Sequence, residues 1–142
     1  ARPAARVDRA PVGAAIVSDA APVVCVDICS DRILAAAEDG LMKEVGLDGG
    51  ELRRFDLSGE PRCLVVCEAS RGALYVVVGR ADGSLVLIAW DESEERYVEE
   101  AAHGAALSAV TVAEGGLLIS CADDCSAATW DFVPDDVDGV AV

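Results

Sequence analysis

The sequence predicts an all-β fold built from a repeated unit of about 42 residues. Three turns contain an aspartate at the same place, Asp39, Asp82 and Asp124, and a short apolar run lies on either side of each turn. These runs are too short for helices and lack a 3.6-residue period, whereas their β-branched and apolar residues are typical of buried strands. A unit of about 40–45 residues with four short strands is the blade of a β-propeller.

The strands are expected in the same order in each unit. The first strand is expected at residues 23–28, 63–67 and 107–112, and the second at residues 33–36, 74–78 and 117–120. The third follows the turn, at residues 41–47, 85–90 and 126–132. A fourth is expected at residues 52–57 and 96–100, and residues 137–142 are the candidate for the last unit.

The repeat divides the chain into an arm and three blades. The N-terminal arm comprises residues 1–21, in which residues 12–18 are a candidate outer strand of a preceding blade; the blades comprise residues 22–59, 60–101 and 102–142, the last with an acidic C-terminal tail. Because propellers close with about 4–8 blades, we expect a partial propeller that belongs to a larger ring or self-associates through its open blade edges. A compact β-sandwich of short strands is the structural alternative.

The last unit contains a set of polar residues that neither of the other two units has in full. His103 precedes its first strand, Ser120 lies on its second, Asp124 lies in its turn and Trp130-Asp131 ends its third strand. This pattern resembles the WD-repeat β-propeller family. The resemblance implies that His103, Ser120, Asp124 and Trp130 form a hydrogen-bonded structural tetrad within the blade. The chemistry is consistent, since a carboxylate can orient an imidazole whose other nitrogen meets a hydroxyl, and the hydroxyl can meet the indole N–H.

The first two units depart from that pattern. The second has Trp90-Asp91, two residues later than the last unit would require, and Ile88 stands at the matching position. The first has Val45 there, and neither unit has the opening histidine. The resemblance therefore covers about residues 22–133, with the full motif only in the last unit.

Composition and charge exclude several classes of function. Hydrophobic residues make up 53 % of the 142 residues but aromatic residues only 4 %, and the net charge is −15. Such a charge argues against direct binding of nucleic acid or of an anionic membrane surface. No apolar run is long enough to span a bilayer.

The negative charge is concentrated in the second half of the chain. Residues 63–142 hold 15 acidic and 3 basic side chains, against 11 and 8 in residues 1–62. The candidate partner-binding residues are Asp91, Glu92, Glu94, Glu95, Glu99 and Glu100. They are interpreted either as a docking surface for a basic protein or as a solvated loop between strands. Residues 135–139 resemble a calcium loop weakly and lack its glutamate, so no metal or cofactor is expected.

Six cysteines form three pairs with a spacing of four residues: Cys25/Cys29, Cys63/Cys67 and Cys121/Cys125. The spacing does not fit a zinc site, and the sequence predicts small buried thiols on one face of each strand. Reduced thiols favour the cytoplasm. The arginine-rich residues 1–11 resemble a transit peptide faintly, and the alternative is an ordinary disordered arm.

The function predicted from these features is a non-catalytic scaffold or adaptor for other proteins. His103 is the only histidine, and a catalytic triad of Ser120, His103 and Asp124 would lack the G-x-S-x-G turn that exposes a nucleophile. Two alternatives stay open. One is a propeller-type hydrolase or esterase that uses a carboxylate or a metal, and the other is a purely structural segment completed by the rest of its propeller or by self-assembly.

Overall fold

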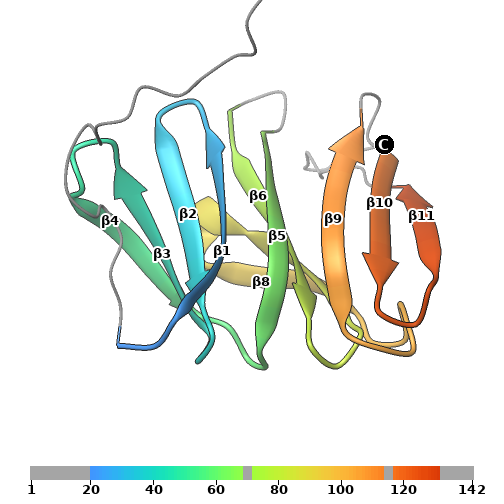
Figure 1. Cartoon of the computed structure of the whole chain (residues 1–142). Coiled ribbons are helices and arrows are strands. Elements are labelled where there is room, and N and C mark those ends of the chain that lie inside the picture. The colour runs from blue at the N-terminus through green and yellow to red at the C-terminus, as the bar shows by residue number, and fades with distance from the viewer. Residues whose placement is uncertain (1–19, 69–71, 114–116, 132–142) are drawn as a thin grey trace, which may run out of the picture.

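The structure, a computed structural model, describes residues 20–68, 72–113 and 117–131, which form strands and one short 3₁₀ helix in three antiparallel sheets (Figure 1). The all-β prediction is confirmed, and the sheets are arranged as consecutive propeller blades rather than as the two layers of a sandwich. The arginine-rich arm, the acidic tail and the candidate strands at residues 12–18 and 137–142 lie outside the described residues.

Each sheet uses its strands in chain order, so that each pair is an antiparallel hairpin. Blade 1 consists of β1 (Val23–Cys29), β2 (Arg32–Ala37), β3 (Leu41–Gly46) and β4 (Glu51–Asp56). Blade 2 consists of β5 (Pro61–Glu68), β6 (Leu74–Arg80), β7 (Leu85–Ala89), the 3₁₀ helix η1 (Trp90–Glu92) and β8 (Glu94–Glu99). Blade 3 consists of β9 (Leu107–Ala113), β10 (Leu117–Ala122) and β11 (Ala127–Asp131). The first strands are neighbours, with β5 between β1 and β9 (Figure 1).

Two apolar clusters hold the blades together, and blade 2 contributes to both. Leu34 and Met42 of blade 1 pack with Val76 and its neighbours on one face of blade 2. Leu107 and Leu118 of blade 3 pack on the opposite face. Because both faces are covered, all seven residues of β6 are buried. This explains why that strand appears in the sequence as an uninterrupted apolar run instead of an alternating one.

The repeated turn aspartates share one local role. Each carboxylate accepts a hydrogen bond from the backbone N–H two residues further on, at 3.1 Å for Asp39, 3.0 Å for Asp82 and 3.1 Å for Asp124. A short acidic side chain closes a turn in this way without help from the rest of the fold. The local chemistry accounts for the spacing on which the repeat was recognised.

The residue after each turn aspartate has a positive φ, which favours glycine. A Cβ on Gly83 would lie 2.4 Å from the carbonyl oxygen of His103, and one on Gly40 would lie 2.6 Å from that of Leu57. The two glycines thus let the turn contact the backbone that leads into the next blade. Blade 3 has Cys125 at this position, with φ 71°. Anything packed against its turn must leave room for a side chain.

The segment at residues 91–95 differs from the loop that the sequence suggested. It forms the end of η1 and the beginning of β8, and Ser93 between them has a φ of 53°. A left-handed residue there lets the chain reverse at once into the outer strand of blade 2. The acidic side chains therefore lie on regular, hydrogen-bonded structure.

Candidate functional site

The polar residues of blade 3 form a chain of hydrogen bonds. Ser120, on β10, is fully buried. Its hydroxyl oxygen accepts a hydrogen bond from the Trp130 indole N–H at 2.9 Å and lies 2.8 Å from Nε2 of His103. Of the four residues implied by the resemblance, these three meet directly at one hydroxyl.

The fourth residue, Asp124, reaches the histidine through a serine that the sequence analysis missed. The Ser126 hydroxyl donates to Asp124 Oδ1 at 2.5 Å and lies 2.7 Å from Nδ1 of His103. The other carboxylate oxygen accepts the Gly104 N–H at 3.0 Å. The Ser126 hydroxyl, followed by backbone N–H groups, holds the pKa of Asp124 below its usual value.

These contacts define one consistent direction of donation. With the Ser126 hydroxyl donating to Asp124 and the imidazole neutral, the Ser126 oxygen accepts a hydrogen bond from Nδ1–H of His103, and Nε2 accepts one from the Ser120 hydroxyl. Every polar group from the indole to the carboxylate then has a partner, as buried polar groups require. The Ser120 hydroxyl is buried and hydrogen-bonded to both His103 and Trp130. This arrangement suits a structural link within the blade better than a nucleophile. The structural role of the tetrad stays a prediction.

Blade 2 has an apolar set at the equivalent positions. Leu57 corresponds to His103, because each donates its N–H to the carbonyl of the preceding blade's turn glycine, at 2.8 Å and 3.0 Å. Val78 and Ile88 correspond to Ser120 and Trp130 by strand register. All three apolar side chains are buried in the cluster between blades 1 and 2. The same space is thus filled once by apolar packing and once by a hydrogen-bonded chain.

Arg80 ties the turn of blade 2 to the segment before β5. Its Nε donates to the Ser84 hydroxyl at 2.7 Å and its Nη1 to the Ser58 carbonyl at 2.5 Å. The Ser84 hydroxyl in turn donates to Asp82, and this bond holds the pKa of Asp82 below its usual value. A buried arginine on the second strand thus contacts the turn serine of blade 2, as His103 contacts Ser126 in blade 3.

A second polar network joins blade 1 to blade 2. Glu44, on β3, is only 3 % exposed. It accepts the Trp90 indole N–H at 2.8 Å and the Arg32 Nε–H at 2.5 Å. Arg32 also donates to Asp91 at 2.6 Å, and the other Asp91 oxygen accepts the Leu74 N–H at 3.1 Å. The Trp90-Asp91 pair therefore links two blades, whereas Trp130 bonds within its own.

The protonation of this network follows from its contacts. Burial opposes ionisation of Glu44, but the hydrogen bonds from Arg32 and Trp90 outweigh it, and the pKa of Glu44 lies below its usual value. The same balance, with Arg32 and the Leu74 N–H as donors, lowers the pKa of Asp91. The Glu44 hydrogen bond raises the pKa of Arg32. All three groups are charged near neutral pH.

The six acidic candidates for partner binding lie in different surroundings. Asp91 belongs to the network with Arg32. Glu92 and Glu94 both pair with Arg96. Glu99 accepts the Tyr97 hydroxyl at 2.5 Å, while Glu95 and Glu100 are exposed.

The cysteines follow the prediction only in part. Cys63 is buried, and burial raises the pKa of its thiol to about 11 and those of Cys25 and Cys67 to about 12. These thiols are protonated near neutral pH, which lowers their reactivity. Cys125 is exposed in the β10–β11 turn, so the prediction of a buried pair with Cys121 on one strand face is wrong.

Within residues 20–68, 72–113 and 117–131 the cysteines are free, and no group of three or more His, Cys, Asp or Glu side chains is placed to hold a metal ion. The same part of the chain contains no helix long and apolar enough to cross a membrane.

Comparison with known proteins identifies the class of fold. No family model and no curated protein matches the sequence. Among solved structures, the RRP9 WD40 repeats match with a TM-score of 0.68 at 17 % identity, over 82 % of this chain and 37 % of that one. U3-55K matches with a TM-score of 0.69 at 17 % identity, over 82 % and 38 %. BBS1N, solved in complex with ARL6DN, matches with a TM-score of 0.68 at 11 % identity, over 80 % and 38 %.

These matches show that the chain has the fold of part of a WD40-type β-propeller. The resemblance drawn from the polar residues of the last unit is confirmed at the level of the fold. The chain spans less than two fifths of the length of each of the three solved structures.

We expect Ser120→Ala to lower the free energy of unfolding by about 2 kcal/mol, because both the imidazole and the indole lose a buried partner. Urea unfolding of the full chain measures this change. The matched control is Ser108→Ala, an exposed serine on β9, which should change the free energy by less than about 0.5 kcal/mol.

A triple variant uses the apolar set of blade 2 to separate hydrogen bonding from packing. In His103→Leu/Ser120→Val/Trp130→Ile the three side chains that meet at Ser120 are replaced together, and Ser126 still donates to Asp124. No donor is then left unpaired, and most of the stability lost in Ser120→Ala should return. Equal free energies of unfolding for Ser120→Ala and the natural chain would refute the structural role of the Ser120 hydroxyl.

Glu44→Gln should reduce the free energy of unfolding by roughly 2 kcal/mol at neutral pH, since Arg32 and Trp90 lose a charged acceptor. Because the pKa of Glu44 is lowered by folding, its contribution is fully present above the usual value of 4.5 and is lost as the pH falls through the lower folded value. The difference between natural chain and variant should therefore be constant above about pH 5 and shrink below it.

Unfolding titrations from neutral to acid pH measure this difference. The control is Glu38→Gln, an exposed carboxylate in the same blade, which should change the free energy of unfolding at neutral pH by less than about 0.5 kcal/mol. A difference that grows as the pH falls would contradict the assignment of a lowered pKa to Glu44.

Proposed function

We propose that the chain is part of a non-catalytic scaffold that binds other proteins through the acidic surface of η1 and β8. The fold supports this proposal, because stacked blades hold their connecting segments rigidly and little ordering entropy is lost on binding. One of the structural neighbours, BBS1N, is itself solved in complex with ARL6DN.

The distribution of charge on an anchored segment carries the proposal. Residues 91–100 include six acidic side chains and a single arginine, Arg96. Asp91 fixes the start of this segment to Arg32 and to the Leu74 N–H, and β8 pairs with β7 along its length. Glu92, Glu94, Glu95 and Glu100 are exposed on that support. The partner that fits is a protein with a basic surface, and its association should weaken with salt.

The double variant Glu94→Lys/Glu95→Lys tests the proposal. Cross-linking in the native cell identifies the partner, and its dissociation constant for the full chain is then measured at low and at physiological salt. We expect binding to weaken about tenfold or more and its salt dependence to flatten, because two favourable charges become repulsive.

The matched control is Asp31→Lys/Glu38→Lys, which makes the same change in net charge on exposed residues of blade 1. It should leave the affinity within about twofold. Unchanged affinity and salt dependence in Glu94→Lys/Glu95→Lys would refute the acidic docking surface. An equal loss in the control would show that only the net charge matters.

A second candidate is a structural segment completed by further blades or by another copy of the chain. Val26 and Ile28 on β1 are 60 % and 54 % exposed, and Leu117 on β10 is 38 % exposed. In the described part of the chain these residues belong to the first and the last blade, each of which has one neighbouring sheet. A native mass that is a multiple of 14.6 kDa and stable on dilution would favour this candidate over a free-standing adaptor.

We also propose a cytoplasmic location. The support is the set of free thiols in the described residues, several of which face the interfaces between blades. Such thiols persist most readily in a reducing compartment.

A further inference from the structure

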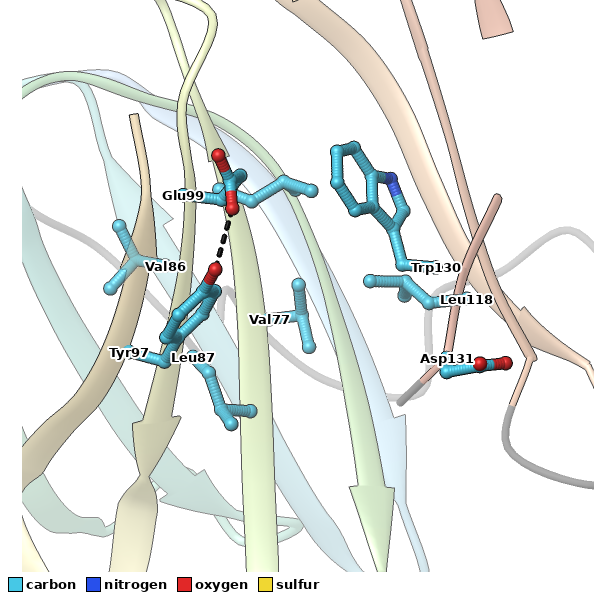
Figure 2. A pocket seen from close by; sticks show the side chains of 9 residues that line it. Val77, Val86, Leu87, Tyr97, Glu99, Leu118, Trp130 and Asp131 are labelled. Carbon is cyan, nitrogen blue, oxygen red and sulfur yellow. Dashed lines mark hydrogen bonds between the residues drawn. The ribbon is translucent and has the colours of Figure 1, made fainter. Parts of the chain in front are cut away.

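A groove of about 270 Å³ lies between the outer strands of blades 2 and 3 (Figure 2). Tyr97 and Leu87 form one wall, and Trp130 and Leu118 face them from blade 3. Glu99 lies beside Tyr97 and accepts a hydrogen bond from its hydroxyl, and Asp131 lies at the opposite side (Figure 2). The lining is therefore apolar and aromatic, with a carboxylate on either side.

The groove lies where the neighbouring interface is filled by a fourth strand. Between blades 1 and 2, Val98 of β8 packs on the apolar cluster, and Phe55 of β4 contacts Trp90 with ring centroids 6.2 Å apart. Between blades 2 and 3, the described residues supply no strand beyond β11. The side chains that a fourth strand would place against Tyr97 and Trp130 are thus absent from this part of the chain.

The edge of β11 presents backbone groups toward the same space. Ala122 and Ser126 form a hydrogen-bonded pair at the start of the β10–β11 ladder. Since such pairs alternate along antiparallel strands, the N–H and C=O groups of Ala127, Thr129 and Asp131 point away from β10. An edge of this kind can pair with an added extended segment.

We propose that this groove and edge bind an extended segment of a basic partner protein as a fourth strand of blade 3. Residues two apart on a strand share a face. The segment would place an aliphatic side chain between Tyr97 and Trp130 and, two residues away, a lysine or arginine next to Glu99. The inference rests on the proposed function and deepens it, because it specifies where and how the basic partner docks.

Charge complementarity favours such a partner over the chain's own C-terminal residues. The lining contains Glu99 and Asp131 and no lysine or arginine. Residues 132–142 contain three aspartates and likewise no lysine or arginine. A negatively charged segment next to two carboxylates would be repelled, whereas a basic one gains from both.

The test uses the full chain and a fluorescein-labelled octapeptide with valine and lysine alternating on one face and threonine on the other. The matched peptide has glutamate in place of each lysine. Fluorescence anisotropy measures binding, and we expect the lysine peptide to bind and the glutamate peptide not to bind. Tyr97→Ala and Glu99→Lys should each weaken binding of the lysine peptide about tenfold or more, and Glu38→Lys, on an exposed residue of blade 1, should leave it within about twofold.

Hydrogen exchange reports the binding mode independently of affinity. The amides of Ala127, Thr129 and Asp131 should exchange more slowly only when the lysine peptide is bound, because they then donate hydrogen bonds to the added strand. Equal binding of the two peptides, or full affinity in Tyr97→Ala, would overturn the proposal. A third result would also overturn the proposal: a chain lacking residues 1–11 binds the lysine peptide about tenfold more tightly than the full chain. That result would show that the arginine-containing arm occupies the groove.

The groove and the acidic surface can fail separately. If the identified partner is sensitive to Glu94→Lys/Glu95→Lys and indifferent to Tyr97→Ala and Glu99→Lys, the groove is rejected and the proposed scaffold function stands. If the partner is indifferent to all of these variants, both are rejected.

Discussion

The rest of the structure depends on the burial of blade 2 on both of its faces. A strand such as β6, in which every residue is buried, has no stable place in an isolated sheet that exposes one side to water. Blade 1 covers one face and blade 3 the other. Gly79 shows how close this packing is, since a Cβ there would lie 2.7 Å from Cys63 Sγ and 2.8 Å from Leu107 Cβ. The three blades therefore form one cooperative body.

The polar contacts are consequences of that packing. Within blade 3, His103 and Ser120 are held together because Leu107 and Leu118 have fixed the sheet against blade 2. Across the other interface, Glu44 tolerates burial because Arg32 and Trp90 reach it from different elements. The second network, through Asp91, anchors the segment that leads into the outer strand β8, and β8 pairs with β7. Rigid support is what an interaction surface requires, and it links the fold to the proposed function.

What could be predicted from the sequence is what depends on local chemistry. The turn aspartates repeat because each closes its own turn, and this spacing, with the apolar runs on either side of each turn, predicted the blades. Ser126 was missed, although Ser84 two residues after Asp82 was a readable signal that the turn serine belongs to the unit. The tetrad positions were implied by the resemblance of the last unit to the WD-repeat family.

What could not be predicted depends on the packing of one blade on another. Glu44 and Trp90 are 46 residues apart, and Arg32 and Asp91 are 59 apart, so nothing near either residue in the sequence indicates its partner. Arg80 ends a strand and is buried, and nothing near it in the sequence indicates that burial. The exposure of Cys125 was not predicted because its spacing from Cys121 is the same as that of the other two pairs.

Native-state hydrogen exchange of the full chain tests the central claim most directly. If the three blades are one body with blade 2 at its centre, the amides of Val76, Val77 and Val78 should be the slowest to exchange. Their opening free energy should equal that of global unfolding and fall with denaturant as steeply. Faster exchange in β6 than in β2 and β10 would show that the outer blades are stable without the middle one, and would contradict the account.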